Sequence, residues 1–166
     1  ETLKEGWDQV YPEGSHEVTL PTSIVYGIER YSGDVYGVDV LAGTSWLEFE
    51  MPTPPGANSA SPNGLAYNPE NGYLYYTDYQ LGTTPDTLYF WDGTAQGVAG
   101  QIAAGTVACG DIDNGKYYYI PSNTDDLYEV TFNPDGTIDT DTKLDDISDD
   151  VQRWTFDGDI AVKGGV

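Results

Sequence analysis

The chain has 166 residues and carries 28 Asp and Glu against six Lys and Arg, so its formal net charge is −22. This balance excludes an ordinary nucleic-acid-binding protein, because phosphate contacts need clustered cations. No stretch approaches the roughly 18 apolar residues of a membrane span, so membrane insertion is not expected. A hydrophobic content of 39% and an aromatic content of 13% nevertheless predict a folded core.

Residues 1–22 are predicted to form an N-terminal segment, and 23–166 the main domain. Within the segment, SHEVTL at 15–20 predicts an outer strand of a preceding or closing unit. The first repeat of the main domain has period-2 runs, typical of antiparallel strands, at 24–30, 34–40 and 45–50. A Pro-, Gly- and Ser-rich connector, MPTPPGANSASPNG at 51–64, then takes the place of a fourth strand.

Two further repeats follow, each with four predicted antiparallel strands. Those of the second repeat are at 64–68, 73–79, 86–91 and 97–103. Those of the third repeat are at 107–113, 116–121, 126–132 and 137–144. The turns between them are rich in Asn, Asp and Gly, which tolerate positive φ and favour hairpins.

The same order of parts recurs along the chain. A Gly opens a short strand, a turn with a second Gly follows, and the next strand carries Tyr. The turn glycines Gly33, Gly72 and Gly115 are 39 and 43 residues apart, and a fourth copy begins as GDIAVKGGV at 158–166. We therefore expect repeating units at about 23–60, 61–105 and 106–155, with a partial unit at 156–166.

Four short antiparallel strands every 40 to 50 residues resemble the blades of β-propellers. The resemblance is to extracellular and surface-layer propellers of the NHL or YVTN kind, in which inner strands read like GLAYNPENGYLYYTD at 64–78. It implies an all-β fold of propeller-like, four-stranded blades, about three of them plus part of a fourth. A β-sandwich is the alternative, since its strands have a similar spacing.

Closed propellers typically have four to eight blades, so three leave strand edges open at both ends. Open edges pair with other strands unless they are blocked. We expect either further blades in a longer chain or self-association of identical subunits. The predicted assembly edges are Val18 and Leu20 at one end, and Ile160, Ala161 and Val162 at the other.

Acidic clusters offer weak candidates for Ca²⁺ sites. TFNPDGTIDTDT at 131–142 places Asn133, Asp135 and Asp139 at the third, fifth and ninth positions of an EF-hand-like loop. Thr131 and Thr142 stand where the leading carboxylate and the bidentate Glu would be, so a plain hairpin explains the stretch equally well.

Two other groups of acids are weak candidates for metal ligands. Asp111 and Asp113 lie on a predicted inner strand, and a second group consists of Asp145, Asp146, Asp149 and Asp150. In both cases the alternative is a solvated acidic surface. No other cofactor is expected.

No catalytic motif stands out. G-x-S-x-G and phosphate-binding Gly-rich loops do not occur, and 28 acids make any one pair of carboxylates uninformative. His16 and Cys109 are 93 positions apart, and Cys109 is interpreted as a small buried apolar thiol.

Aromatic residues dominate the predicted strands and are expected to pack mainly between blades. Trp46 and Trp154 are also predicted to be core residues. The strand tyrosines are Tyr73, Tyr75, Tyr76, Tyr79, Tyr89, Tyr117, Tyr118, Tyr119 and Tyr128.

The charge favours a salt-adapted protein, because self-repulsion opposes compaction unless salt screens it. An acidic exported protein from a moderate environment is the alternative. We expect a non-catalytic module, extracellular or on the cell surface, that serves as a scaffold, self-assembles or binds a ligand. Polysaccharide or another surface protein would be a suitable partner. The competing hypothesis is a fragment of a propeller hydrolase or lyase that acts on polysaccharide.

Overall fold

The computed structural model describes residues 24–29, 32–50, 62–78, 86–122, 124–147 and 160–163. These ranges hold strands and turns but no helix, and therefore no helix that could cross a membrane. The strands form three antiparallel sheets, each a meander in chain order. The expected all-β fold of blade-like sheets is confirmed, and the three sheets do not close into a ring.

The first sheet has three strands and the other two have four each. The first consists of β1 (Ile24–Ile28), β2 (Val35–Asp39) and β3 (Thr44–Phe49). The second consists of β4 (Pro62–Asn68), β5 (Tyr73–Asp78), β6 (Thr87–Trp91) and β7 (Gln96–Gln101). The third consists of β8 (Val107–Asp113), β9 (Lys116–Pro121), β10 (Asp126–Phe132) and β11 (Ile138–Asp146). Each strand predicted for the three repeats is present within two residues at either end.

The turn glycines explain why the repeats begin alike. Gly33, Gly72 and Gly115 all have φ between 72° and 79°, which glycine adopts without steric cost. In the first two repeats the glycine N–H closes the same five-residue turn, from Gly33 to Glu29 O at 2.9 Å and from Gly72 to Asn68 O at 2.8 Å. The third repeat uses a tighter Asn-Gly turn, in which Asn114 also has positive φ.

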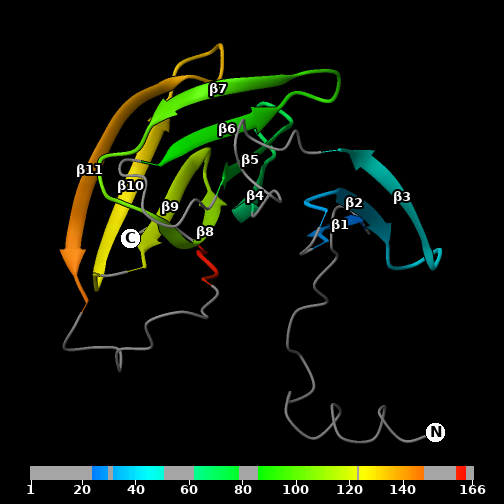
Figure 1. Cartoon of the computed structure of the whole chain (residues 1–166), viewed down its shortest axis with the longest axis horizontal. Coiled ribbons are helices and arrows are strands. Elements are labelled where there is room, and N and C mark those ends of the chain that lie inside the picture. The colour runs from blue at the N-terminus through cyan, green and yellow to red at the C-terminus, as the bar shows by residue number, and fades with distance from the viewer. Residues whose placement is uncertain are drawn as a thin grey trace, which may run out of the picture.

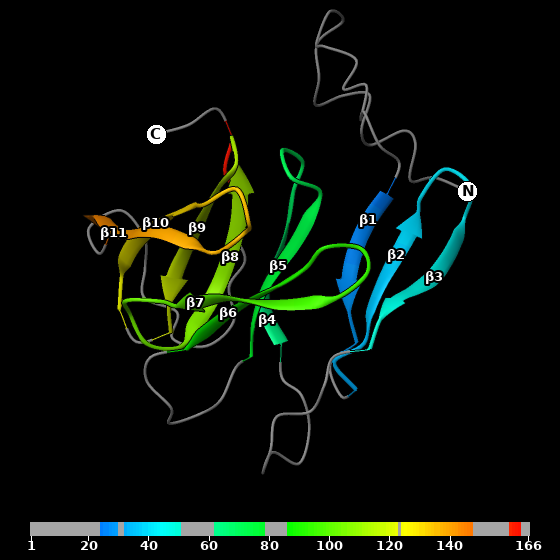
Figure 2. The ribbon, with the colours of Figure 1, turned by 90° about the horizontal axis from the view of Figure 1, so that it is seen from above.

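The first strands of the three sheets lie next to one another, and the later strands extend away from them (Figures 1 and 2). β4 contacts both β1 and β8. The Asn63 side chain links β4 to β8, since its Nδ2 donates to Val107 O at 2.9 Å and to Ala108 O at 2.8 Å. β3 and β11 lie at opposite outer sides of the molecule (Figure 2).

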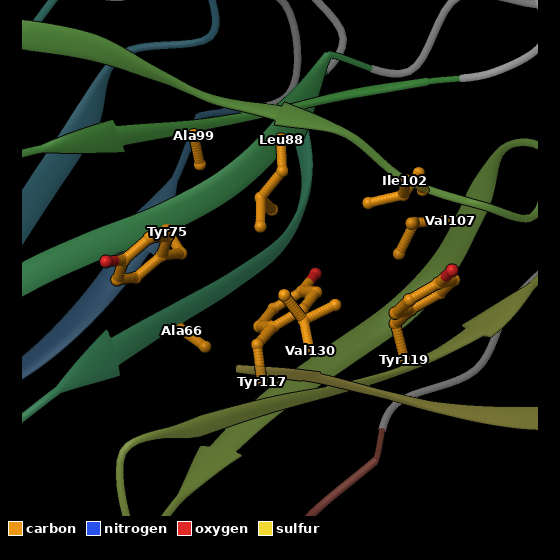
Figure 3. Packing of buried hydrophobic residues seen from close by; sticks show 9 residues of the cluster. All are labelled: Ala66, Tyr75, Leu88, Ala99, Ile102, Val107, Tyr117, Tyr119 and Val130. Atoms are coloured by element: carbon orange, nitrogen blue, oxygen red, sulfur yellow. The ribbon is translucent and has the colours of Figure 1, made fainter. Parts of the chain in front are cut away.

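The larger core fills the space between the second and third sheets (Figure 3). The side chains of this core are almost wholly buried. They are Ala66, Tyr75, Leu88, Ala99, Ile102, Val107, Tyr117, Tyr119 and Val130. Tyr75 also stacks on Phe132 of the third sheet, with ring centroids 4.1 Å apart. The prediction that strand tyrosines pack between blades is confirmed for these positions.

A smaller core joins the first two sheets. Val35 and Phe49 of the first sheet pack with Leu74 and Tyr76 of the second. Phe49 also stacks on Trp91, with ring centroids 4.8 Å apart. Each neighbouring pair of sheets is thus held together by buried aromatic and aliphatic side chains.

The first sheet differs from the other two in the face that it turns toward its neighbour. Val35, Leu74 and Tyr117 each lie two residues after the turn glycine of their repeat. Leu74 and Tyr117 face the preceding sheet, and the Tyr117 hydroxyl donates to Gly64 O of that sheet at 2.9 Å. Val35 instead faces the following sheet, where Leu74 buries it. The described chain gives the first sheet only this neighbour, so its most apolar face is turned there.

Two expectations from the sequence are wrong. Trp46 is 38% exposed and lies over Gly37 at the surface, where its indole N–H donates to Glu48 Oε2 at 2.7 Å. Residues 160–163, expected to form an inner strand at Ile160–Val162, adopt no strand. Val162 N bonds to the Asp111 side chain, so this N–H takes no part in a ladder of backbone hydrogen bonds. Trp154 lies outside the described residues.

Candidate functional site

A cleft opens where the first strands of the three sheets meet. Its volume is about 310 Å³, and it is lined by Ile24, Val25, Tyr26, Leu65, Ala66, Tyr67 and Asp111. β1 and β4 supply the apolar and aromatic walls, and β8 supplies a carboxylate, that of Asp111. Small-molecule sites are usually concave, mostly apolar and provided with a few polar groups, and this cleft has that character.

Two tyrosines form the aromatic part of the wall. The rings of Tyr26 and Tyr67 lie 5.5 Å apart at an angle of 35°. Tyr67 is 41% exposed, so its ring is open to a ligand. Burial, and then the negative charge of Glu48, raises the pKa of Tyr26 above its usual value. Tyr26 therefore stays neutral and keeps its hydroxyl proton for donation.

Asp111 provides the polar part of the cleft. It lies on β8 opposite Tyr118 of β9, and its Oδ2 accepts a hydrogen bond from Val162 N at 2.8 Å. The carboxylate thus connects the cleft to the segment 160–163. Asp113, the other acid proposed from this strand, does not line the cleft, and its Oδ2 accepts from Asn114 Nδ2 at 2.7 Å.

The three residues of the predicted Ca²⁺ loop are hydrogen-bonded within their hairpin. Asp135 Oδ1 accepts from Thr137 N at 3.1 Å and from Thr137 Oγ1 at 2.6 Å, which lowers the Asp135 pKa. Asn133 Nδ2 donates to Thr137 Oγ1 at 3.1 Å, and Asp139 Oδ2 accepts from Thr131 Oγ1 at 3.4 Å. These contacts are those of a strand-turn-strand hairpin.

The remaining acidic candidates lie on the last strand or beyond it. Asp145 and Asp146 are exposed on β11, and Asp149 and Asp150 lie outside the described residues. No group of three or more His, Cys, Asp and Glu in the described part of the chain has the arrangement of a metal site.

One polar network was not foreseen from the sequence. The buried Tyr119 hydroxyl donates to both oxygens of Asp141, at 3.1 and 3.0 Å. Asp141 Oδ2 also accepts from Ala103 N at 2.5 Å, which ties β11 to the loop after β7. Burial raises the pKa of Asp141 and that of Tyr119. In the sequence Asp141 does not differ from the other acids of its strand. Only the structure shows that it bonds to Tyr119 and Ala103, which are distant in the chain.

Cys109 is a buried free thiol, as expected. Of the predicted assembly edges, Val18 and Leu20 lie outside the described residues. The other edge, Ile160 to Val162, lies against β8 through the contact of Val162 with Asp111.

No protein-family model and no curated protein matches the chain. Among solved structures, a chain in the crystal structure of a nidogen/laminin complex is similar, with a TM-score of 0.44 and 10% identical residues. The similarity covers 72% of this chain and 59% of that chain.

Proposed function

We propose that this chain is a non-catalytic scaffold and ligand-binding module of an extracellular or cell-surface protein in a salt-adapted microbe. We further propose that it belongs with propellers of the NHL or YVTN kind. One observation carries the proposal: β1, β4 and β8 lie next to one another around a shared cleft, with a sheet extending from each. Rigid sheets around a common cleft suit display and binding.

The outer strands support a role in assembly. Leu47 on β3, Val98 on β7 and Leu144 on β11 are large apolar side chains that are exposed to solvent. Within the described residues β3, β7 and β11 each pair on one side only, and exposed apolar side chains on such outer strands favour association with another sheet. In this proposal the sheets are completed by further blades of a longer polypeptide or by other copies of the chain.

The net negative charge supports the proposal that the protein is adapted to high salt. The net charge of −22 lies on a chain in which the two described lysines of the third sheet are already paired, Lys116 with Glu129 at 3.0 Å and Lys143 with Asp126 at 2.6 Å. The rest of the acidic surface is left to be screened by salt.

The competing hypothesis of a polysaccharide hydrolase or lyase finds less support in the cleft. Glycoside hydrolysis uses two carboxyl groups that flank one bond, and among the residues that the structure describes, Asp111 is the one acid that lines the cleft. Assays on acidic polysaccharides, with and without Ca²⁺, test this directly. We expect no new reducing ends and no unsaturated product, and either product would overturn the non-catalytic proposal.

Assembly is tested by Leu47→Glu with Leu41→Glu as its control. Leu47 lies on β3, whereas Leu41 is 87% exposed in the turn before it. If β3 meets a second copy, Leu47→Glu buries a charge and weakens association about tenfold or more, while Leu41→Glu leaves it unchanged. Light scattering gives the mass of each variant. An equal mass for Leu47→Glu and the wild type would contradict this interface.

A further inference from the structure

We propose that the cleft between β1, β4 and β8 binds a small organic cation, an ammonium group joined to an aromatic or alkyl body. The inference deepens the ligand-binding part of the proposed function and rests on it. The scaffold role is tested separately by the mass of the protein in solution, so the two can fail independently.

The size and the walls of the cleft fit the body of such a ligand. A volume of about 310 Å³ lies at the small end of ligand sites, which suits one ring or a short chain. Ile24, Val25, Leu65 and Ala66 offer apolar contacts from two neighbouring strands. Since Ile24 and Val25 are exposed, a ligand that covers them removes apolar surface from water.

The tyrosine pair fits a positive charge as well as a flat body. An ammonium group over the face of a Tyr ring is attracted by the negative face of its π system. The ring centroids of Tyr26 and Tyr67 lie 5.5 Å apart, so a ligand beside the exposed Tyr67 ring is also close to the Tyr26 ring. The aromatic wall thus serves both parts of an arylalkyl ammonium ion.

The charge around the cleft selects a cation over a neutral or anionic ligand. Among the described residues that line the cleft, Asp111 is the one that carries a charge, and, besides burial, the negative charge of Glu48 helps to raise the pKa of Tyr26. A carboxylate has about four lone-pair sites, so the hydrogen bond from Val162 leaves Asp111 able to accept from an ammonium group. The net charge of −22 attracts cations toward the whole molecule.

The test compares three probes that share a phenylethyl group on the full chain: 2-phenylethylammonium, 2-phenylethanol and 3-phenylpropionate. Binding is followed by NMR titration, which also reports whether residues of β1, β4 and β8 shift. We expect the ammonium probe to bind about tenfold more tightly than the alcohol, and the carboxylate to bind least. Added salt should reduce the difference, because the charge contact is partly exposed.

Variants distinguish the contribution of the Asp111 charge to binding from that of the aromatic wall. Asp111→Asn should abolish the preference for the ammonium probe while the alcohol binds as before, and Tyr67→Ala should weaken both. Asp113→Asn is the matched control, because Asp113 lies two residues away on the same strand but outside the cleft. Val162→Pro removes the backbone donor to Asp111 and keeps the carboxylate, so the preference for the cation should survive.

Equal affinity for ammonium ion and alcohol, or a preference that persists in Asp111→Asn, would overturn the assignment of a cation. Tighter binding of the carboxylate, or shifts confined to residues outside the three strands, would do the same. Because Tyr67 is substantially exposed, Tyr67→Ala should keep the fold and give a valid result even if Asp111→Asn does not fold.

Discussion

Gly110 lets the Tyr117 ring lie directly against the backbone of β8. A Cβ at this position would collide with the Tyr117 ring and hydroxyl, whereas a Cβ at Gly27 on β1 would meet nothing within 4 Å. Neither glycine has positive φ, so an added methyl group strains neither backbone, and only the one at Gly110 meets a neighbouring ring. The packing of Tyr117 against β8 therefore requires a residue without a side chain at position 110.

We predict that Gly110→Ala destabilises the protein by about 1–3 kcal/mol, the usual cost of overpacking a core. Gly27→Ala is the control and should be neutral or slightly stabilising, since it restricts the unfolded chain without a clash. Urea unfolding followed by tyrosine and tryptophan fluorescence measures both. Equal stability of the two variants would show that Tyr117 does not pack on Gly110.

Asp135 and Asp141 should respond to pH in opposite directions. The Asp135 pKa is lowered from 3.8 by its bonds to Thr137, so its charged form stabilises the fold above the unfolded pKa. That contribution is lost as the pH falls through the folded pKa. The Asp141 pKa is raised from 3.8 by burial, so its ionised form costs stability above the folded pKa, and the cost vanishes below 3.8.

The measurement is the melting temperature of Asp135→Asn and Asp141→Asn, each relative to the wild type, from pH 7 down to pH 3. As the pH falls, the melting temperature of Asp135→Asn should move closer to that of the wild type. The melting temperature of Asp141→Asn should fall relative to that of the wild type. Parallel trends for the two variants would contradict the partial burial of Asp141 and its hydrogen bond with Tyr119.

At this scale the sequence was informative where alternation decides the environment of a side chain. Tyr75, Tyr117 and Tyr119 are buried as their strands predicted. Trp46 was misjudged because its surroundings depend on which face the first sheet turns inward. Asp141 was missed because its partners lie 22 and 38 residues away in the chain.

At the scale of elements, the contact between the second and third sheets depends on stacked rings. Phe132 of β10 stacks on Tyr75 of β5, and Ile138 packs against the same core. This pairing joins the outer part of the third sheet to the middle of the second.

We predict that Phe132→Ala lowers the free energy of unfolding by about 2 kcal/mol or more, because it removes a ring from a packed interface. Val98→Ala on β7 is the control, since Val98 is exposed and should change stability by less than about 0.5 kcal/mol. Chemical denaturation of both variants decides. A loss for Phe132→Ala as small as that of Val98→Ala would contradict the packing between the two sheets.

The strands themselves could be predicted because their turn residues and their alternation are local signals. The orientation of a sheet is not local. Val35 matches Leu74 and Tyr117 in its repeat, yet it faces the other way because the burial available to it depends on its neighbours. The cleft could not be predicted from the repeat pattern either, since β1, β4 and β8 bring together side chains that lie up to 87 positions apart.

At the scale of the whole molecule, we expect the net charge of −22 to make the stability of the protein depend on salt. The screening length falls from about 10 Å at 0.1 M to about 3 Å at 1 M, so repulsion between neighbouring carboxylates fades. We predict that the melting temperature rises markedly between 0.1 and 2 M NaCl.

The double variant Asp145→Asn/Asp146→Asn serves as the control for this effect. It removes two exposed charges from β11 and should flatten the dependence on salt. The same melting temperature at low and high salt in the wild type would exclude adaptation to brine.

The most direct measurement is the mass of the wild-type chain in molar NaCl, by sedimentation velocity over a wide range of concentration. If the outer sheets are completed by another sheet, the isolated chain should associate, and its mass should approach a multiple of 18.1 kDa as concentration rises. A compact particle of 18.1 kDa at every concentration would contradict completion by another copy.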